Sequence, residues 1–113
     1  MPVADDLVNR VRSALAHVPD VEEKRMFGSL GFLVRGKLCI GARPDRIMCR
    51  IDPQLHNALL RRGDCRTVIM RGREYRGYLH VGAESLGTEA ALRYWVDLAL
   101  HYNTALTSQD GAS

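Results

Sequence analysis

The chain has 113 residues and a formal net charge of +3, with 46% hydrophobic and 26% charged residues. This length is typical of one domain that buries a core without disulfide staples. The composition is ordinary for a globular protein, and so small a charge bears on solubility before it bears on nucleic acid.

The number and spacing of the cysteines and the N-terminal sequence indicate the cellular compartment of the protein. The three cysteines, at positions 39, 49 and 65, form neither a CxxC pair nor an even framework. Reduced thiols are therefore favoured over a secreted disulfide scaffold. The opening MPVADDLVNRVRSALAHV has two early acids and no uninterrupted apolar segment, so we expect no signal peptide. The apolar runs are too short to span a membrane. We expect a cytoplasmic protein.

The first half of the chain predicts one helix and then short strands. Apolar residues at helical spacing indicate a helix over 6–17, capped by Asp5 or Asp6 and ended by Pro19. In the turns that follow, Gly36 can supply a positive φ and Pro44 suits the second position. The expected strands cover about residues 24–27, 30–35, 37–42 and 46–51.

The second half begins with the strongest local signal, DPQLHNALLRRG, in which Asp52 can cap a helix, Pro53 fits its first turn and Gly63 lies just past its end. Two strands follow, RTVIM and EYRGYLHV, and Thr88 then caps a long helix to about residue 105. The polar tail is expected to be disordered. We predict a single domain over 1–106 and a disordered tail over 107–113.

The order of these elements predicts the fold class. A run of strands interrupted by single helices is typical of an α+β domain with a mostly antiparallel sheet. The broad apolar side of the helix over 88–105 must be buried, and the sheet is the available surface. We therefore expect two layers, with the helices on one face of the sheet.

The cysteines are the first candidates for chemistry. If 43–46 closes a tight hairpin, residue 40 faces 49, and Cys39 and Cys49 point to opposite faces of the sheet; a one-residue bulge would reverse this. His80 is a conceivable third ligand, but a structural zinc site needs four ligands. We expect buried, inert thiols and no cofactor. Metal or small-ligand binding through Cys39, Cys49 or His80 stays open as an alternative.

No catalytic set is recognisable. The histidines at 17, 56, 80 and 101 are scattered, and no Ser-His-acid, HExxH or nucleophile-elbow pattern occurs. Glu22 and Glu23 are adjacent, so they point apart in an extended segment. The glycines of GSLGFLVRG lead into strands, whereas a phosphate-binding loop opens into a helix. We therefore expect no enzyme and name no catalytic, cofactor-binding or metal-binding residue.

Charge is unevenly distributed along the chain. Residues 61–80 hold six arginines against two acids, a net +4, whereas residues 81–113 hold one arginine against four acids, a net −3. Such a run beside tyrosines can hold phosphates and stack bases. It can equally be a charged sheet edge or a surface for an acidic partner protein. The candidate contact residues are Arg61, Arg62, Arg66, Arg71, Arg73, Arg76, Tyr75 and Tyr78.

Three segments together resemble a known family. VEEKRMFGSLGFLVRGKLCIGARPDRIMCRIDP is similar to the opening of the TfoX/Sxy N-terminal domain family, with its Lys-x-Met-Phe-Gly-Gly block and Asp-Arg-Leu-x-x-Arg strand. RGREYRGYLHV resembles the family's Gly-Arg-Pro-Met-(Lys/Arg)-Gly strand, and LRYWVDLALHYNTAL its closing helix. The likeness covers about residues 5–106. Ser29 departs from the usual second glycine, and Glu74-Tyr75 from the usual Pro-Met.

The resemblance implies an α-β(3)-α-β(2)-α order akin to secretion-chaperone-like domains, without a catalytic residue set. It also implies that Met26 and Phe27 supply core while the glycines of the first segment permit its turns. The competence regulators that name the family carry a second, C-terminal helical domain, and we expect this chain to be a stand-alone N-terminal domain without it. We therefore expect a small non-catalytic regulatory module that binds a protein partner, with a homodimer left open. Nucleic-acid binding through residues 61–76 and small-ligand or metal binding are the alternatives.

Overall fold

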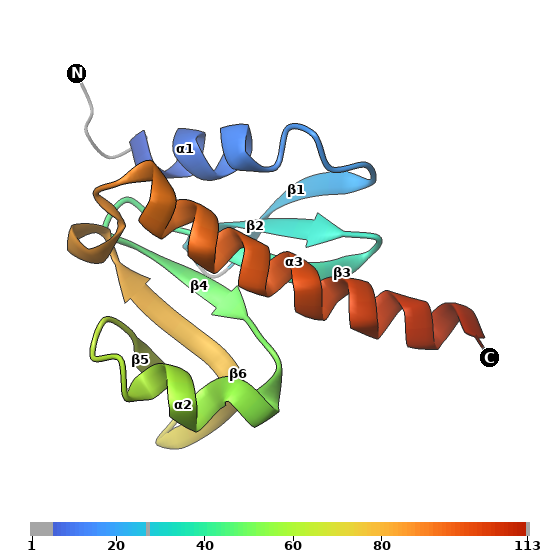
Figure 1. Ribbon diagram of the computed structural model, residues 1–113. Helices are drawn as coiled ribbons and strands as arrows, with labels where there is room; N and C mark the ends of the chain where they lie inside the picture. The colour runs from blue at the N-terminus through green and yellow to red at the C-terminus, as the bar shows by residue number, and fades with distance from the viewer. Residues whose placement is uncertain (1–5, 27, 113) are drawn as a thin grey trace.

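The computed structural model describes residues 6–26 and 28–112, with side chains as far as residue 108. Its centre is a six-stranded antiparallel sheet in the order β1-β2-β3-β4-β6-β5 (Figure 1). The strands are β1 (Val21–Met26), β2 (Ser29–Val34), β3 (Lys37–Ala42), β4 (Arg46–Arg50), β5 (Arg66–Met70) and β6 (Arg73–Gly82).

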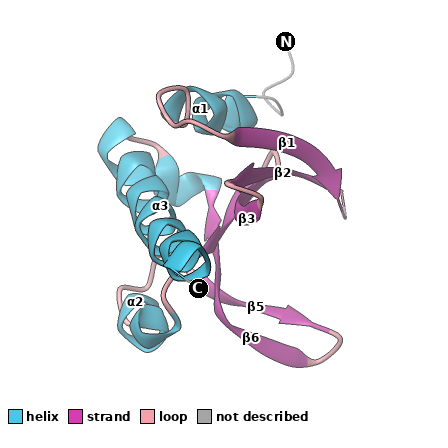
Figure 2. Ribbon diagram, turned by 90° about the vertical axis from the view of Figure 1, so that its right-hand side faces the viewer, coloured by secondary structure: helices cyan, strands magenta, loops and turns pink. Residues whose placement is uncertain are grey.

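The helices lie on one side of this sheet, and the β5–β6 hairpin projects away from them (Figure 2). The α-helices are α1 (Asp6–Ala14), α2 (His56–Leu60) and α3 (Glu89–Ala112), and two short 3-10 helices are η2 (Pro53–Leu55) and η3 (Ala83–Leu86). The predicted α+β class with helices on one face is confirmed. Four strands precede α2, as strand patterning indicated, one more than the order that the resemblance implied.

The caps predicted at Asp52 and Thr88 are present, whereas Asp5, one of the two residues expected to cap the first helix, lies outside the described residues. The Asp52 carboxylate accepts a hydrogen bond from the backbone N–H of Gln54 at 2.9 Å, and the Thr88 hydroxyl accepts one from the N–H of Ala91 at 3.1 Å. These bonds satisfy donors that a helix N-terminus leaves free. Gly63 has a φ of +85°, which suits a residue just past a helix end.

Two helices end at other residues than the sequence suggested. After Ala14, backbone bonds of the i→i−3 type replace the α-helical ladder, as in the bond from the Val18 N–H to the Leu15 carbonyl, so α1 stops short of residue 17. At the other end, α3 continues to Ala112. Residues 106–110 contain neither proline nor glycine to stop it.

The core fills the space between the sheet and the helices. Side chains from neighbouring strands form a cross-strand row in which Phe32 pairs with Ile40, and Ile40 with Cys49. Trp95 of α3 packs in the same cluster, and it is 1% exposed. Burying one large apolar side chain stabilises a fold by roughly 1.5–3 kcal/mol. The sheet face toward the helices and the helices themselves both contribute to this buried cluster.

A bulge in β3 corrects the expectation for the cysteines. Phe32 pairs with Ile40 and Leu33 with Leu38, so Cys39 is the extra residue on its strand. Cys39 and Cys49, 1% and 0% exposed, consequently both lie in the core rather than on opposite faces of the sheet. The predicted pairing of residue 40 with residue 49 is confirmed.

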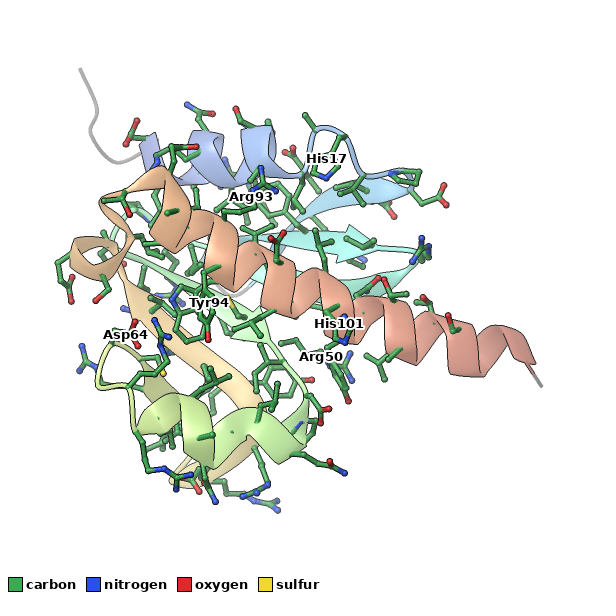
Figure 3. The ribbon with its side chains drawn as sticks, viewed as in Figure 1. His17, Arg50, Asp64, Arg93, Tyr94 and His101 are labelled. Atoms are coloured by element: carbon green, nitrogen blue, oxygen red, sulfur yellow. The ribbon has the colours of Figure 1, made fainter. Side chains whose placement is uncertain are left out.

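The histidines do not converge. His17 and His101 are exposed on the turn after α1 and on α3 (Figure 3), whereas His56 is buried on α2 and His80 lies on β6. Among the residues that the structure describes, no group of three or more His, Cys, Asp or Glu side chains could hold a metal ion.

Candidate binding site on the open face of the sheet

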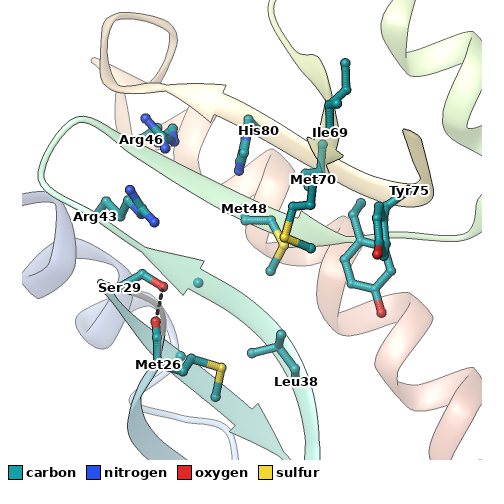
Figure 4. Close-up of a pocket in the computed structure, with 14 residues that line it drawn as sticks. Met26, Ser29, Leu38, Arg43, Arg46, Met48, Ile69, Met70, Tyr75 and His80 are labelled. Carbon is teal, nitrogen blue, oxygen red and sulfur yellow. Dashed lines mark hydrogen bonds between the residues drawn. The ribbon is translucent and has the colours of Figure 1, made fainter. Parts of the chain in front are cut away.

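The sheet face opposite the helices is hollowed into a groove, here called the open groove. It lies between the β1–β2–β3 part of the sheet and the β5–β6 hairpin, and its cavity volume is about 430 Å³ (Figure 4). Most of its lining is apolar. Its lining includes Met26, Leu38, Met48, Met70, Tyr75 and His80.

Two glycines form the floor of the open groove. Gly31 of β2 pairs with Gly41 of β3, and Gly41 pairs with Met48 of β4. A Cβ atom added to Gly31 would lie 3.0 Å from Cε of Met26, and one added to Gly41 would lie 3.6 Å from Cε of Met48. The ends of the Met26 and Met48 side chains therefore occupy the space that side chains at positions 31 and 41 would need.

This packing revises the expected role of the first glycine-rich segment. Gly28 and Gly36 have φ values of +76° and +82°, so they serve the expected turns. Gly31 and Gly41 lie within strands and instead admit methionine ends. Met26 is half-buried and lines the open groove rather than the core. Phe27 lies outside the described residues.

The β5–β6 hairpin forms an apolar wall of the groove. Met70 is 51% exposed and Tyr75 is 37% exposed, although both side chains are large and apolar or aromatic. The ring of Tyr75 contacts that of Tyr78 edge to face, with centroids 6.3 Å apart. Exposed apolar side chains gathered in one hollow are typical of interaction surfaces, and methionine is common where a surface adapts to its ligand.

One end of the groove is basic. Arg43 and Arg46 line it beside His80 (Figure 4), and Arg66 of β5 is the cross-strand partner of His80. Burial lowers the pKa of His80, and Arg46, Arg43 and Arg66 lower it further against a smaller opposing effect of Asp45. His80 is therefore neutral at pH 7.

The predicted arginine run is divided between two sides of the sheet. Arg66 and Arg73 pair across the hairpin with His80 and Met70, both of which line the open groove. Because cross-strand partners lie on the same side of a sheet, these two arginines belong to the open side. Tyr75 and Tyr78 line the groove itself.

Other members of the run lie on the helix side. Arg62 stacks 4.4 Å from the ring centroid of Tyr94 on α3 and forms an ion pair with Asp64 at 3.0 Å (Figure 3). Glu74 and Arg76 flank the groove-lining Tyr75 on β6, so the alternation of side chains places both on the other face of the sheet. Burial lowers the pKa of His56 on α2, while Glu74 raises it and Arg76 lowers it. Arg61 is exposed just after α2, and Arg71 is exposed in the turn between β5 and β6. Whether any of these residues contacts nucleic acid or a partner stays a prediction.

Sequence reasoning did not single out Arg43, Arg46, Met48 or Met70. The strand RIMCR carried a usable signal, because Ile47 and Cys49 are buried on the helix side while Met48 faces the groove. The alternation of side chains along a strand assigns these three residues to their faces of the sheet. Only the pairing of β4 with β6, however, brings Met48 beside His80.

The described residues show no reactive thiol. Burial raises the pKa of Cys39 to about 12 and also raises the pKa of Cys49 and of Cys65. A thiol held protonated in this way is a poor nucleophile and a poor metal ligand.

These features define an α+β domain that buries one sheet face under helices and has a largely apolar groove on the other. The chain belongs to the TfoX N-terminal domain family, whose family model matches residues 13–102. The resemblance of the three segments is thereby confirmed. No curated protein and no solved structure matches the chain. None of the described helices combines the length and apolar character needed to cross a membrane.

Proposed function

We propose that this chain is a small, non-catalytic regulatory module of the cytoplasm that binds a protein partner in the open groove. The observation that carries the proposal is a methionine-lined hollow on the sheet face that the described helices leave uncovered. Membership of the TfoX N-terminal domain family supports the regulatory role.

The shape of the site favours a protein over a small molecule. A volume of about 430 Å³ falls in the range of small-ligand pockets, roughly 300–1,000 Å³. However, such pockets enclose most of their ligand, whereas this hollow has an exposed wall. Met70 and Tyr75 remain half-exposed on a hairpin that projects from the body of the domain. A polypeptide segment can cover both the hollow and the hairpin.

Site-specific photo-crosslinking in cells tests the proposal. A photoreactive phenylalanine analogue replaces Tyr75 in one variant and Tyr94 in another, and these tyrosines are matched in exposure at 37% and 38%. We expect a discrete cross-linked protein from position 75 and not from position 94. Adding Met48→Lys, which places a charge in the groove, should abolish the adduct.

Two outcomes would contradict the proposal. One is equal cross-linking from both positions, and the other is an adduct that survives Met48→Lys in a variant whose unfolding curve is unchanged. A cross-link to a second copy of the chain would identify the partner as a homodimer mate.

A further inference from the structure

The open groove has two chemically different ends. Arg43, Arg46 and His80 lie at one end, and Tyr75 lies toward the other, with Met48 and Met70 between them (Figure 4). A ligand that fills the groove therefore meets guanidinium groups at one end and apolar or aromatic side chains along the rest.

The basic end keeps an excess of positive charge. Asp45 forms an ion pair with Arg46 at 3.1 Å, but the Asp45 side chain is 70% exposed. The Glu84 carboxylate lies over Gly82, the cross-strand partner of Arg46, and among the described residues no ion pair joins it to Arg46. Among the residues that the structure describes at this end, three arginines, counting Arg66, stand beside two carboxylates.

Arg46 also has a spare donor. Its Nε is buried and has no hydrogen-bond acceptor among the described residues. A buried donor without an acceptor is unfavourable, so a ligand that supplies an acceptor as the part-exposed Arg46 side chain turns toward it is favoured. A carboxylate is a suitable acceptor because guanidinium and carboxylate groups form strong, directional hydrogen bonds.

We infer that the partner segment in the open groove carries consecutive apolar side chains followed by a carboxylate, with the apolar part over Met48 and Met70 and the carboxylate at the basic end. This inference rests on the proposed function and adds the chemistry and the polarity of the occupant. The apolar centre argues against a nucleic acid strand, because each nucleotide would bring a phosphate that needs its own cation.

The test uses purified protein and a displayed library of random peptides of about ten residues, a length that extends roughly 33 Å as a strand. Peptides are selected on the natural chain, and the most frequent one is labelled for fluorescence anisotropy. Its affinity is then measured for Arg66→Glu and Arg61→Glu. Both variants change the net charge equally, and both residues are exposed, but only Arg66 pairs with His80. Unfolding curves establish that each variant is folded. If Arg66→Glu does not fold, Arg66→Gln replaces it in the comparison.

We expect recovered peptides to place Asp or Glu beside a run of Leu, Ile, Met or Phe. Arg66→Glu should weaken binding at least about tenfold, equivalent to roughly 1.4 kcal/mol, while Arg61→Glu changes it less than about twofold. Acidic-apolar peptides that bind both variants equally would overturn the inference. If the recovered peptides are apolar, contain no acidic residue and no longer bind the Met48→Lys variant, the inference is overturned but the proposed function still holds. Peptides that bind regardless of Met48→Lys, or no peptides at all, would overturn both.

Discussion

The backbone N–H of Gly77 donates a hydrogen bond of 3.0 Å to Nδ1 of His56, so this ring nitrogen carries no proton. The proton of the neutral ring is therefore on Nε2, which lies 3.0 Å from the hydroxyl of Thr67 and donates to it. The imidazole is 1% exposed. It joins α2 to both strands of the β5–β6 hairpin and so sets the position of the wall of the open groove.

Replacing His56 with alanine should lower the free energy of unfolding by roughly 2–4 kcal/mol, because it leaves a cavity and a buried N–H without an acceptor. Urea denaturation of the two proteins measures the difference. His17→Ala is the matched control, since His17 is exposed and should change stability by less than about 0.5 kcal/mol. Equal effects of the two substitutions would show that the His56 contacts do not support the hairpin.

Stability should fall as the pH falls below about 6.5, the pKa of an unperturbed histidine. Burial lowers the pKa of both His56 and His80 in the folded chain. Below that pH the unfolded chain therefore binds more protons than the folded chain, and protonation favours unfolding. Above it, the full stabilisation is present. Urea midpoints at about pH 7.5 and about pH 5.5 measure this dependence. The variant His56→Gln keeps a neutral hydrogen-bond acceptor, so its stability should decrease less between these two pH values. An equal decrease in the variant would show that His56 does not cause the pH dependence.

Gly77→Ala should destabilise the fold more than Gly36→Ala. Both glycines have a positive φ, +93° and +82°, so alanine costs each position roughly 1–2 kcal/mol in backbone strain. A Cβ at position 77 would also lie 3.2 Å from the Ile51 carbonyl oxygen and from Cγ of Pro53, whereas at position 36 it meets nothing within 4 Å. We expect a total loss of roughly 2–4 kcal/mol at position 77. Thermal unfolding of the two variants makes the comparison, and equal losses would mean that this close packing is relieved at no cost.

The native thiols should react slowly with Ellman's reagent at about pH 8 and quickly in denaturant, since only the thiolate attacks. Burial raises the pKa of Cys39 to about 12. Cys65, which is 9% exposed and donates a hydrogen bond to the Leu59 carbonyl at 3.3 Å, should react first. A thiol that reacts in the folded protein as fast as in the unfolded one would contradict this and reopen a redox or metal role.

Nucleic acid provides a separate test of the arginine run. Because Arg73 and Arg76 lie on opposite sides of the sheet, we expect labelled duplex DNA and single-stranded RNA to show weak anisotropy changes even at low salt. The variant Arg71→Ala/Arg73→Ala/Arg76→Ala should change them little. Tight, salt-sensitive binding that is lost in this variant would instead establish the hairpin as a nucleic-acid contact.

The sequence was informative wherever a local rule decides the structure. Asp52 and Thr88 were predicted as helix caps because capping depends on only a few neighbouring residues. The alternation of buried and exposed positions located the strands for the same reason. The class of fold then followed from the order of the elements, because few arrangements bury a helix stripe against a sheet.

Features that depend on pairing between strands were not accessible in this way. The bulge at Cys39 is defined only by its register against Phe32 and Leu33, so the sequence left the cysteine faces open. The open groove likewise requires Met26, Met48 and Met70, which lie on three non-adjacent strands. The arginine run was conspicuous along the chain, yet the alternation of side chains and the irregular register of β5 against β6 divide it in space.

The paired glycines under Met26 and Met48 allow the shape of the open groove to change without a change in the buried core. Single methyl groups at positions 31 and 41 would make the groove shallower, while Phe32 and Ile40, their neighbours in sequence, project into the core on the other side. Under the proposed function, partner choice and thermodynamic stability are thus encoded by interleaved but separate sets of positions. Related domains can therefore diverge in specificity along the same two strands and keep an identical interior.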